Sequence, residues 1–181
     1  MNTTLLALIA IAIVLAIIGT LVLAASKPDV FHLQRSIVID AMPARIFPLI
    51  NDLRAHESWN PFDKPDPDTR KTHAGAEQGA GSIYEWDGKG QAGAGRLSIL
   101  ESAPSSRIAM QLEMLKPFKS SNQVIFQLAP AGSATHLTWT MQGPVPYPAK
   151  VMHVFFNMDR MIGRQFETGL ANLKNIVENH R

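Results

Sequence analysis

The alternation of hydrophobic and polar residues divides most of the chain into strands followed by one helix. The first strand candidate runs from Phe31 to Asp40, where apolar residues alternate with His, Gln and Ser. The same period of two recurs over residues 82–86, 96–101, 107–115, 123–128 and 135–142. Turns rich in Gly, Pro and Ser separate these segments. The order predicts an antiparallel meander that buries one face.

Helical spacing dominates the C-terminal part of the chain. Residues 149–178 contain no proline, and their large apolar residues recur every three or four positions, which predicts one long amphipathic helix. A shorter helix is expected over residues 44–51, although Pro48 is an awkward member. Residues 60–81 are rich in Pro, Asp and Gly and are expected to form a loop, with Asp63, Asp66 and Asp68 in solvent. The long helix is available to cover the sheet.

The N-terminal segment is uniformly apolar from Leu5 to Ala25. About 20 such residues in a helix cross a hydrocarbon core of about 30 Å, which predicts a single-pass anchor over residues 1–26. A cleaved signal peptide is the alternative, but no Lys or Arg precedes the run, which is longer than a signal peptide needs. Lys27 and Arg35 follow the span, so the positive-inside rule favours a cytoplasmic location for the soluble domain, residues 27–181.

Composition narrows the chemistry. The chain has 181 residues, of which 46% are hydrophobic, enough for one domain of ordinary size. Its net charge of +2 comes from interspersed acids and bases without a basic block, which argues against nucleic acid as a partner. It has no cysteine, and its six histidines lack metal-ligand spacing, so we expect no metal.

A glycine-rich run over residues 88–93 fits the dinucleotide pattern G-x-G-x-x-G. A phosphate loop opens a helix, whose N-terminus holds the pyrophosphate. Here the following residues, 96–101, alternate like a strand, and Asp87-Gly88 is a hairpin-turn dipeptide. The run therefore predicts a β-hairpin, and we expect no nucleotide or other cofactor.

Several motifs together are similar to those of a known superfamily. They are Ser36–Ile39 with Met42–Phe47, Asp52 followed by Trp59-Asn60-Pro61, the hairpin over residues 79–88 and 93–95, Thr138–Gly143, and Gly163–Lys174. Across residues 30–177 the chain resembles the START-like (SRPBCC) superfamily of polyketide cyclases, lipid-transfer proteins and plant allergens, in particular its membrane-anchored bacterial members. The resemblance implies an α+β helix-grip fold, a curved antiparallel sheet wrapped around a long C-terminal helix. It also implies a location at the bacterial inner membrane.

In that fold the gap between sheet and helix is commonly a ligand cavity. Strand alternation and helical spacing suggest its lining: Tyr84, Trp86, Met110, Leu112, Trp139 and Met141 from strands, and Met158, Ile162 and Phe166 from the helix, with Trp59 closing the mouth. Such a lining suits a hydrophobic small molecule or a lipid chain. The alternative is that these side chains simply fill a core.

Asp159 is the one weak catalytic candidate, because it borders the apolar stripe of the long helix. A carboxylate held in an apolar gap can act as a general acid or base, but Asp159 could equally pair with a cation at the helix edge. His136 is expected to face solvent, and His153 need not face inward.

The leading hypothesis is a membrane-anchored binding domain without clear catalysis. The alternatives are a polyketide cyclase/dehydrase-type enzyme and a protein-interaction module with a filled core. The sequence predicts no oligomeric state.

Overall fold

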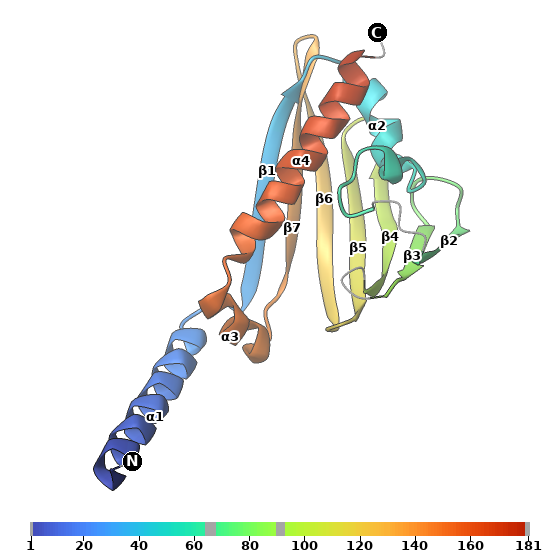
Figure 1. The fold of residues 1–181 in the computed structure, drawn as a ribbon. Coiled ribbons are helices and arrows are strands. Elements are labelled where there is room, and N and C mark those ends of the chain that lie inside the picture. Colours follow the sequence, from blue (N-terminus) through green and yellow to red (C-terminus); the bar gives the residue numbers. More distant parts are fainter. Residues whose placement is uncertain (1, 64–67, 90–92, 180–181) are drawn as a thin grey trace. The chain divides into compact units, whose positions relative to one another are not determined.

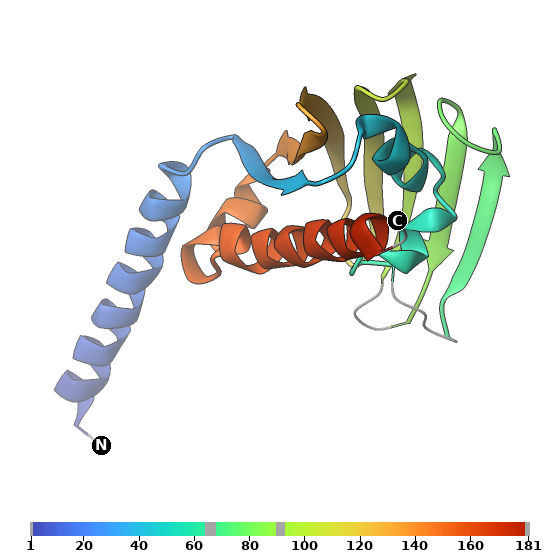
Figure 2. The same ribbon diagram turned by 90° about the horizontal axis from the view of Figure 1, so that it is seen from above.

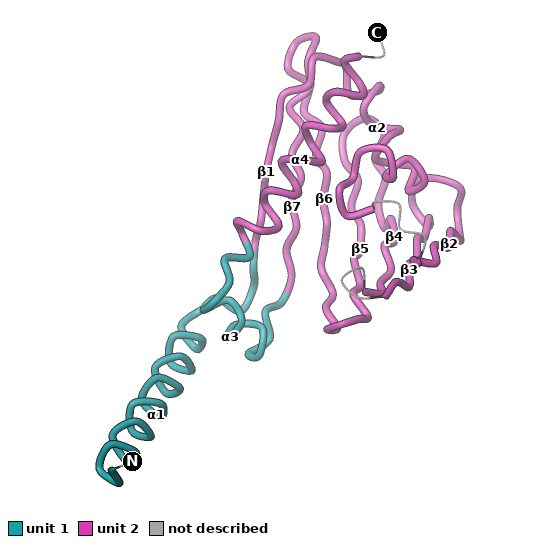
Figure 3. The backbone as a smooth tube through the Cα atoms, in the orientation of Figure 1, with its two compact units in different colours: residues 1–31, 144–158 teal, residues 32–143, 159–181 magenta. Residues whose placement is uncertain are grey.

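The computed structural model describes residues 2–63, 68–89 and 93–179 (Figure 1). The helices are α1 (Thr3–Ala25), α2 (Pro43–Asn51), the short 3-10 helix η1 (Ala55–Ser58), α3 (Tyr147–Phe155) and α4 (Met158–Asn179). The strands are β1 (Val30–Ile39), β2 (Arg70–Gly75), β3 (Ser82–Asp87), β4 (Ala94–Ala103), β5 (Arg107–Lys116), β6 (Ser120–Ala131) and β7 (Ala134–Pro144). They form two compact units, residues 1–31 with 144–158 and residues 32–143 with 159–181 (Figure 3).

The larger unit is a curved sheet with a helix on its concave face. The sheet has the strand order β1-β7-β6-β5-β4-β3-β2, and successive strands from β2 to β7 pair antiparallel. Figure 2 shows α4 lying along the hollow side of the sheet. The predicted α+β helix-grip fold is confirmed.

Burial follows the pattern that the sequence predicts. On α4 the buried residues recur at helical spacing and form one face towards the sheet: Gly163, Phe166, Gly169, Leu170, Leu173 and Val177. In β6 alternate residues are buried, namely Asn122, Val124, Phe126 and Leu128. Side chains from these two faces therefore meet in the core of the larger unit.

Two expectations about secondary structure are wrong. β2 lies inside the segment expected to be a loop, and it was missed because Arg70–Gly75 has no apolar alternation and pairs only at the sheet edge, with β3. The expected single C-terminal helix is two helices, because Phe156 is extended, with φ −118° and ψ 129°. Asn157 then precedes α4, at a position where Asn is favoured because its side chain can cap a helix.

The glycine-rich run joins β3 to β4, as predicted. The two strands pair antiparallel up to Asp87 and Ala94, and the N–H of Gly88 donates to the carbonyl oxygen of Gly93 at 2.8 Å. Gly93 has a φ of +62°, a conformation that favours glycine. β4 follows the turn directly, so no helix N-terminus is present to hold a phosphate; residues 90–92 lie outside the described part of the chain.

Candidate functional site

The register of the strands arranges the concave face in rows of side chains across the sheet, and four rows follow the buried pair Leu128 and Leu137. Residues paired across neighbouring antiparallel strands point to the same face. The first row is Ile108, Phe126 and Trp139, and the second is Ile99, Met110, Val124 and Met141. The third row is Tyr84, Leu97, Leu112 and Asn122, and the fourth is Trp86, Gly95 and Met114. We call the first two the closed rows and the last two the open rows.

Aromatic rings fill the space above the first closed row. The rings of Trp139 and Phe166 stack with centroids 3.9 Å apart, and Trp59 meets Trp139 edge-on at 5.6 Å. A Cβ atom added at Gly169 would lie 2.9 Å from the Trp139 ring and 3.0 Å from Pro61, so α4 rests directly on the indole. Here no room remains for a ligand, because the helix and the rings occupy it.

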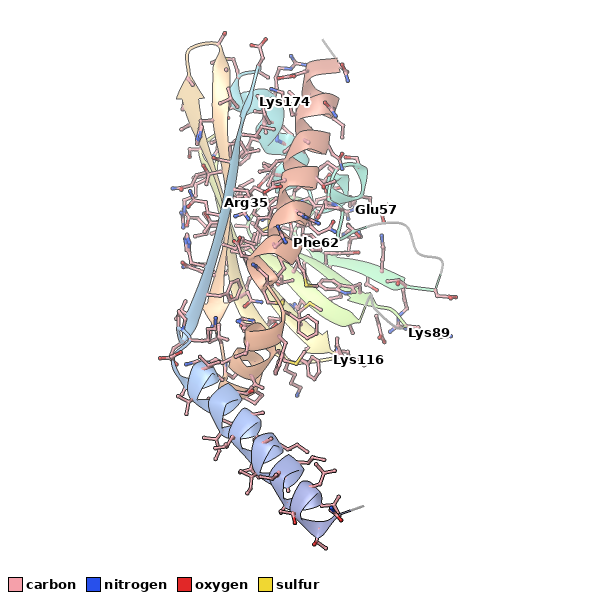
Figure 4. The ribbon with its side chains drawn as sticks, turned by 60° about the vertical axis from the view of Figure 1, so that its left-hand side comes forward. Arg35, Glu57, Phe62, Lys89, Lys116 and Lys174 are labelled. Atoms are coloured by element: carbon pink, nitrogen blue, oxygen red, sulfur yellow. The ribbon has the colours of Figure 1, made fainter. Side chains whose placement is uncertain are left out.

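Trp59 does not lie at the mouth of a cavity, and the exposed ring near this cluster is Phe62. Trp59 is 1% exposed and its Nε1 donates to the carbonyl oxygen of Leu49 at 2.9 Å, so it lies in the core and does not close an opening. Phe62 is exposed at the outer edge of the cluster, 6.2 Å from the ring of Phe166, and Figure 4 shows it beside α4.

Exposure increases from the closed rows to the open rows. Ile99, Met110, Val124 and Met141 are buried, with at most 7% of each exposed. In the open rows Leu97, Leu112, Trp86 and Met114 are all partly exposed. Ile162, one turn before Phe166 on α4, is partly exposed as well. Solvent therefore reaches apolar side chains of the open rows, although Tyr84 and Asn122 in the third row are buried.

Trp86 is the largest side chain of the open rows. A Cβ atom at Gly95 would collide with the six-membered ring of the Trp86 indole, so the indole lies flat across the glycine of the next strand. The Trp86 indole stacks on Tyr84 with centroids 5.6 Å apart, and His73 also stacks on Tyr84, at 5.0 Å. Glycine at position 95 is therefore required by the close approach of Trp86.

Asn122 places a buried polar atom at the third row. It is 8% exposed, its Oδ1 has no hydrogen-bond partner among the described residues, and a Cβ at Gly143 would collide with it. An unsatisfied buried acceptor costs about 1–3 kcal/mol, which a ligand donor could recover. Sequence reasoning missed Asn122 because the strand candidate began one residue later, at Gln123, whereas β6 begins at Ser120.

A partly buried ionic network supports the outer strands. Lys71 on β2 lies 2.6 Å from the Oε1 of Glu57 and 2.9 Å from the Oδ1 of Asp63, and the hydroxyl of Tyr84 donates to Asp63 at 2.6 Å. The expectation that Asp63 lies in solvent is wrong, because the side chain is 5% exposed; Asp66 lies outside the described residues and Asp68 is exposed. Nothing in a linear pattern predicts these pairings, which join residues 8 to 21 positions apart.

The two proton-bearing groups of this network, Tyr84 and Lys71, both have raised pKa values. Burial, and then the hydrogen bond to Asp63, raises the pKa of the Tyr84 hydroxyl far above its usual value. Burial alone would lower the pKa of Lys71, but the hydrogen bonds to Glu57 and Asp63 and the charges of both carboxylates outweigh it and raise that pKa. Both groups remain protonated at neutral pH, which suits a structural tie better than proton transfer.

Asp159 occupies the helix edge and pairs with a cation. Its carboxylate lies 3.1 Å from the guanidinium of Arg35, which also lies 2.8 Å from Glu167, and the Asp159 side chain is 67% exposed (Figure 4). Of the two arrangements expected for Asp159, the structure shows the ion pair at the helix edge and not the carboxylate in an apolar gap. Asp159 therefore lacks the apolar surroundings in which it could act as an acid or base. His136 is exposed, whereas Met158 and His153 belong to the smaller unit. Among residues 2–63, 68–89 and 93–179, no cluster of His, Asp and Glu could hold a metal.

A separate hollow of polar character is lined by Asp52, Arg54, Glu77 and Gln78. Two of its groups already have partners. The guanidinium of Arg54 donates to the backbone carbonyl oxygen of Glu77 at 2.8 Å, and the backbone N–H of Arg54 donates to the carboxylate of Asp52 at 2.9 Å. It contains none of the apolar residues of the concave face, so we assign the candidate ligand site to the open rows.

Comparison with known proteins supports a ligand-binding domain. Residues 30–178 match the family described as polyketide cyclase / dehydrase and lipid transport. Protein MLL2253 from Mesorhizobium loti has 14% identity and a TM-score of 0.59, over 83% of this chain and 99% of its own. The Aha1 dimer from Colwellia psychrerythraea has 15% identity and a TM-score of 0.58, over 82% and 96%. Protein CV1439 from Chromobacterium violaceum has 18% identity and a TM-score of 0.57, over 84% and 99%. These identities establish the fold alone, and no curated protein matches the chain.

Proposed function

Because the chain belongs to the polyketide cyclase/dehydrase and lipid transport family, we propose that it is a membrane-anchored domain that binds a hydrophobic small molecule or a lipid chain. The observation that carries this proposal is the gradient of exposure along the concave face. A module with a filled core would bury all four rows, whereas Leu97, Leu112, Trp86 and Met114 stay partly exposed. Apolar, aromatic and thioether side chains around a single polar atom are typical of a small-molecule site.

The surroundings of Asn122 suggest the chemistry of the ligand. Its free acceptor is uncharged, and the partly exposed neighbours in the open rows are apolar, so a charged group placed there would lose its hydration without an ionic partner. A hydroxyl or amide N–H would instead donate to the Asn122 oxygen once that side chain turns from Gly143 towards the open rows. The ligand class that fits best is a neutral, mostly apolar molecule with one such donor.

Binding without turnover fits the state of three ionisable groups near this face. Asp159 is exposed and paired with Arg35, and Lys71 and Tyr84 hold their protons at neutral pH. An acid–base enzyme would require a group that exchanges a proton near pH 7 beside the bound substrate. No cofactor is part of the proposal.

The anchor in this proposal is α1. Its 23 residues have a mean hydropathy of 3.1 over their most apolar stretch, and they are long and apolar enough to cross a membrane. A signal sequence would have a similar composition, but its apolar run needs only about 7–15 residues, fewer than the 23 of α1. We therefore propose that residues 1–26 are retained in the bacterial inner membrane and that residues 27–181 form a cytoplasmic domain.

The test compares two substitutions on neighbouring residues of β5. Met114→Trp places a larger ring in the open rows, whereas Leu115→Trp adds the same ring on the opposite, exposed face. The full chain, extracted from membranes in mild detergent, is titrated with long-chain alcohols, the matching fatty acids and aromatic alcohols, with detection by native mass spectrometry and thermal shift. We expect binding of an alcohol, weakened about tenfold or more by Met114→Trp and unchanged by Leu115→Trp. Empty protein and no thermal shift across the panel would refute the proposal.

A further inference from the structure

α3 is held against the C-terminal end of α1 within the smaller unit. The Tyr147 hydroxyl donates to the carbonyl oxygen of Leu21 at 2.9 Å, one turn before α1 ends. The Lys150 ammonium lies 2.6 Å from the carboxylate of Asp29, and the N–H of Val145 donates to the carbonyl oxygen of Asp29 at 2.7 Å. Figure 3 shows the two helices in this unit. α3 is therefore fixed to the last turn of α1 and to the residues just after it.

The exposed side of α3 is apolar and aromatic. Tyr147, Met152, Phe155 and the following Phe156 are between 45% and 66% exposed. The only Lys of the helix, Lys150, is buried, and its ammonium pairs with the exposed carboxylate of Asp29. Four large apolar side chains exposed together along ten residues form a patch of the kind that marks an interaction surface. Without a partner, this amphipathic helix leaves its apolar face in water.

The position of α3 along α1 identifies the partner. A helix of 23 residues is about 35 Å long and therefore fills a hydrocarbon core of about 30 Å, so its last turn lies at the level of the lipid headgroups. Tyr147 is bonded to that turn, and Tyr and Phe are suited to this interface. Lys27, exposed two residues after α1, adds a cation where lipid phosphates lie.

We propose that α3 is a membrane-surface helix, which inserts Tyr147, Met152, Phe155 and Phe156 into the headgroup boundary of the bilayer that α1 crosses. The inference rests on the proposed retention of α1 as an anchor. It adds a second membrane contact more than 120 residues away in the sequence. The chain then touches the bilayer through one spanning helix and one helix that lies in its surface, about 5–10 Å deep.

The absence of cysteine from the chain makes the test direct, because a single introduced cysteine carries the only label. The full chain is reconstituted in vesicles of phosphatidylcholine and phosphatidylglycerol with an environment-sensitive fluorophore at Phe155→Cys, His153→Cys or Leu8→Cys. Spin-labelled lipids quench the probe, with the label either near the headgroup or near the end of the acyl chain. His153 is the matched control, because it lies on the same helix away from the apolar face.

The expected pattern differs at the three positions. The probe at 155 should be quenched several-fold more than the probe at 153, and most strongly by the shallow spin label. The probe at 8, in the first half of α1, should be quenched more strongly by the deep label. Quenching at 8 but not at 155 would overturn the inference while leaving the anchor intact, and no quenching at 8 would overturn both. Weak quenching at 155 that increases when the protein is diluted in lipid would instead assign the patch to a contact between copies of the chain.

Discussion

Tyr84→Phe removes one oxygen atom from the partly buried network that holds the outer strands of the sheet. The ring keeps its stacking partners, His73 and Trp86, and only the 2.6 Å hydrogen bond to Asp63 is lost. The Oδ2 atom of the Asp63 carboxylate already has no partner among the described residues. After the substitution, the ion pair between Lys71 and Oδ1 is the remaining interaction that stabilises this carboxylate. Loss of a hydrogen bond to a charged, buried group lowers the free energy of unfolding by about 1.5–3 kcal/mol.

The magnitude can be checked by equilibrium unfolding of the full chain in mild detergent. Trp59, Trp86 and Trp139 all lie in the larger unit, so intrinsic fluorescence reports its unfolding. For a domain of this size the expected loss corresponds to a melting temperature lower by about 3–12 °C. Tyr147→Phe is the control, because Tyr147 and the backbone carbonyl to which its exposed hydroxyl donates both belong to the smaller unit. This substitution should change the unfolding free energy of the larger unit by about 0.5 kcal/mol or less.

A double-mutant cycle with Asp63→Asn isolates the pair. If the hydroxyl acts through the carboxylate, the two substitutions together cost less than the sum of the single changes, because the second removes an interaction that is already broken. A loss below about 0.5 kcal/mol for Tyr84→Phe, or full additivity with Asp63→Asn, would refute the account of this network.

Two further predictions concern the core. Burial lowers the pKa of His56 below its ordinary value of 6.5, with the hydrogen bond to Ile50 opposing this in part, so below that pH the unfolded chain takes up a proton that the folded chain does not. The His56 contribution to stability is therefore complete well above pH 6.5 and is lost progressively as the pH falls below that value. His56→Gln should flatten the stability profile on this acid side, and an unchanged slope would contradict the assignment. Gly169→Val should lower the free energy of unfolding by about 1–3 kcal/mol in urea titrations, because the valine side chain would meet Trp139 and Pro61. The control is Thr168→Val on the exposed side of α4, which should change that free energy by about 0.5 kcal/mol or less. Equal effects of the two substitutions would contradict the close packing at Gly169.

The sequence predicts well those strands that have one buried face and one solvent-facing face, because apolar and polar residues must alternate along them. β6 and β7 carry Val124, Phe126, Leu137 and Trp139 at alternate positions, and the structure buries all four. β2 has no such face, since it pairs only through β3, and nothing in Arg70–Gly75 distinguishes it from a loop. The break between α3 and α4 was missed because apolar residues continue at helical spacing through Phe155.

The site was predicted less completely than the fold. Alternation correctly groups Met110 with Leu112, and Tyr84 with Trp86, on shared faces, but it cannot show which rows the helix covers. That depends on Gly169 and Trp139, which are 30 positions apart and determine how closely α4 approaches the sheet. Asn122 and the Lys71–Asp63 pair were missed for a related reason, because their roles depend on partners from other strands and loops.

The direction of the exposure gradient limits how a molecule can enter and leave. Successive rows on a strand are about 6.6–6.8 Å apart, and the second row, with Met110 and Met141, forms a wall. A ligand bound as proposed on the open rows would meet this wall at its leading end, and it would depart by the route along which it arrived. Length, more than width, would then select among ligands: a compact ring system could fit whole, whereas a long acyl chain would leave its far end outside, free to remain among other lipids.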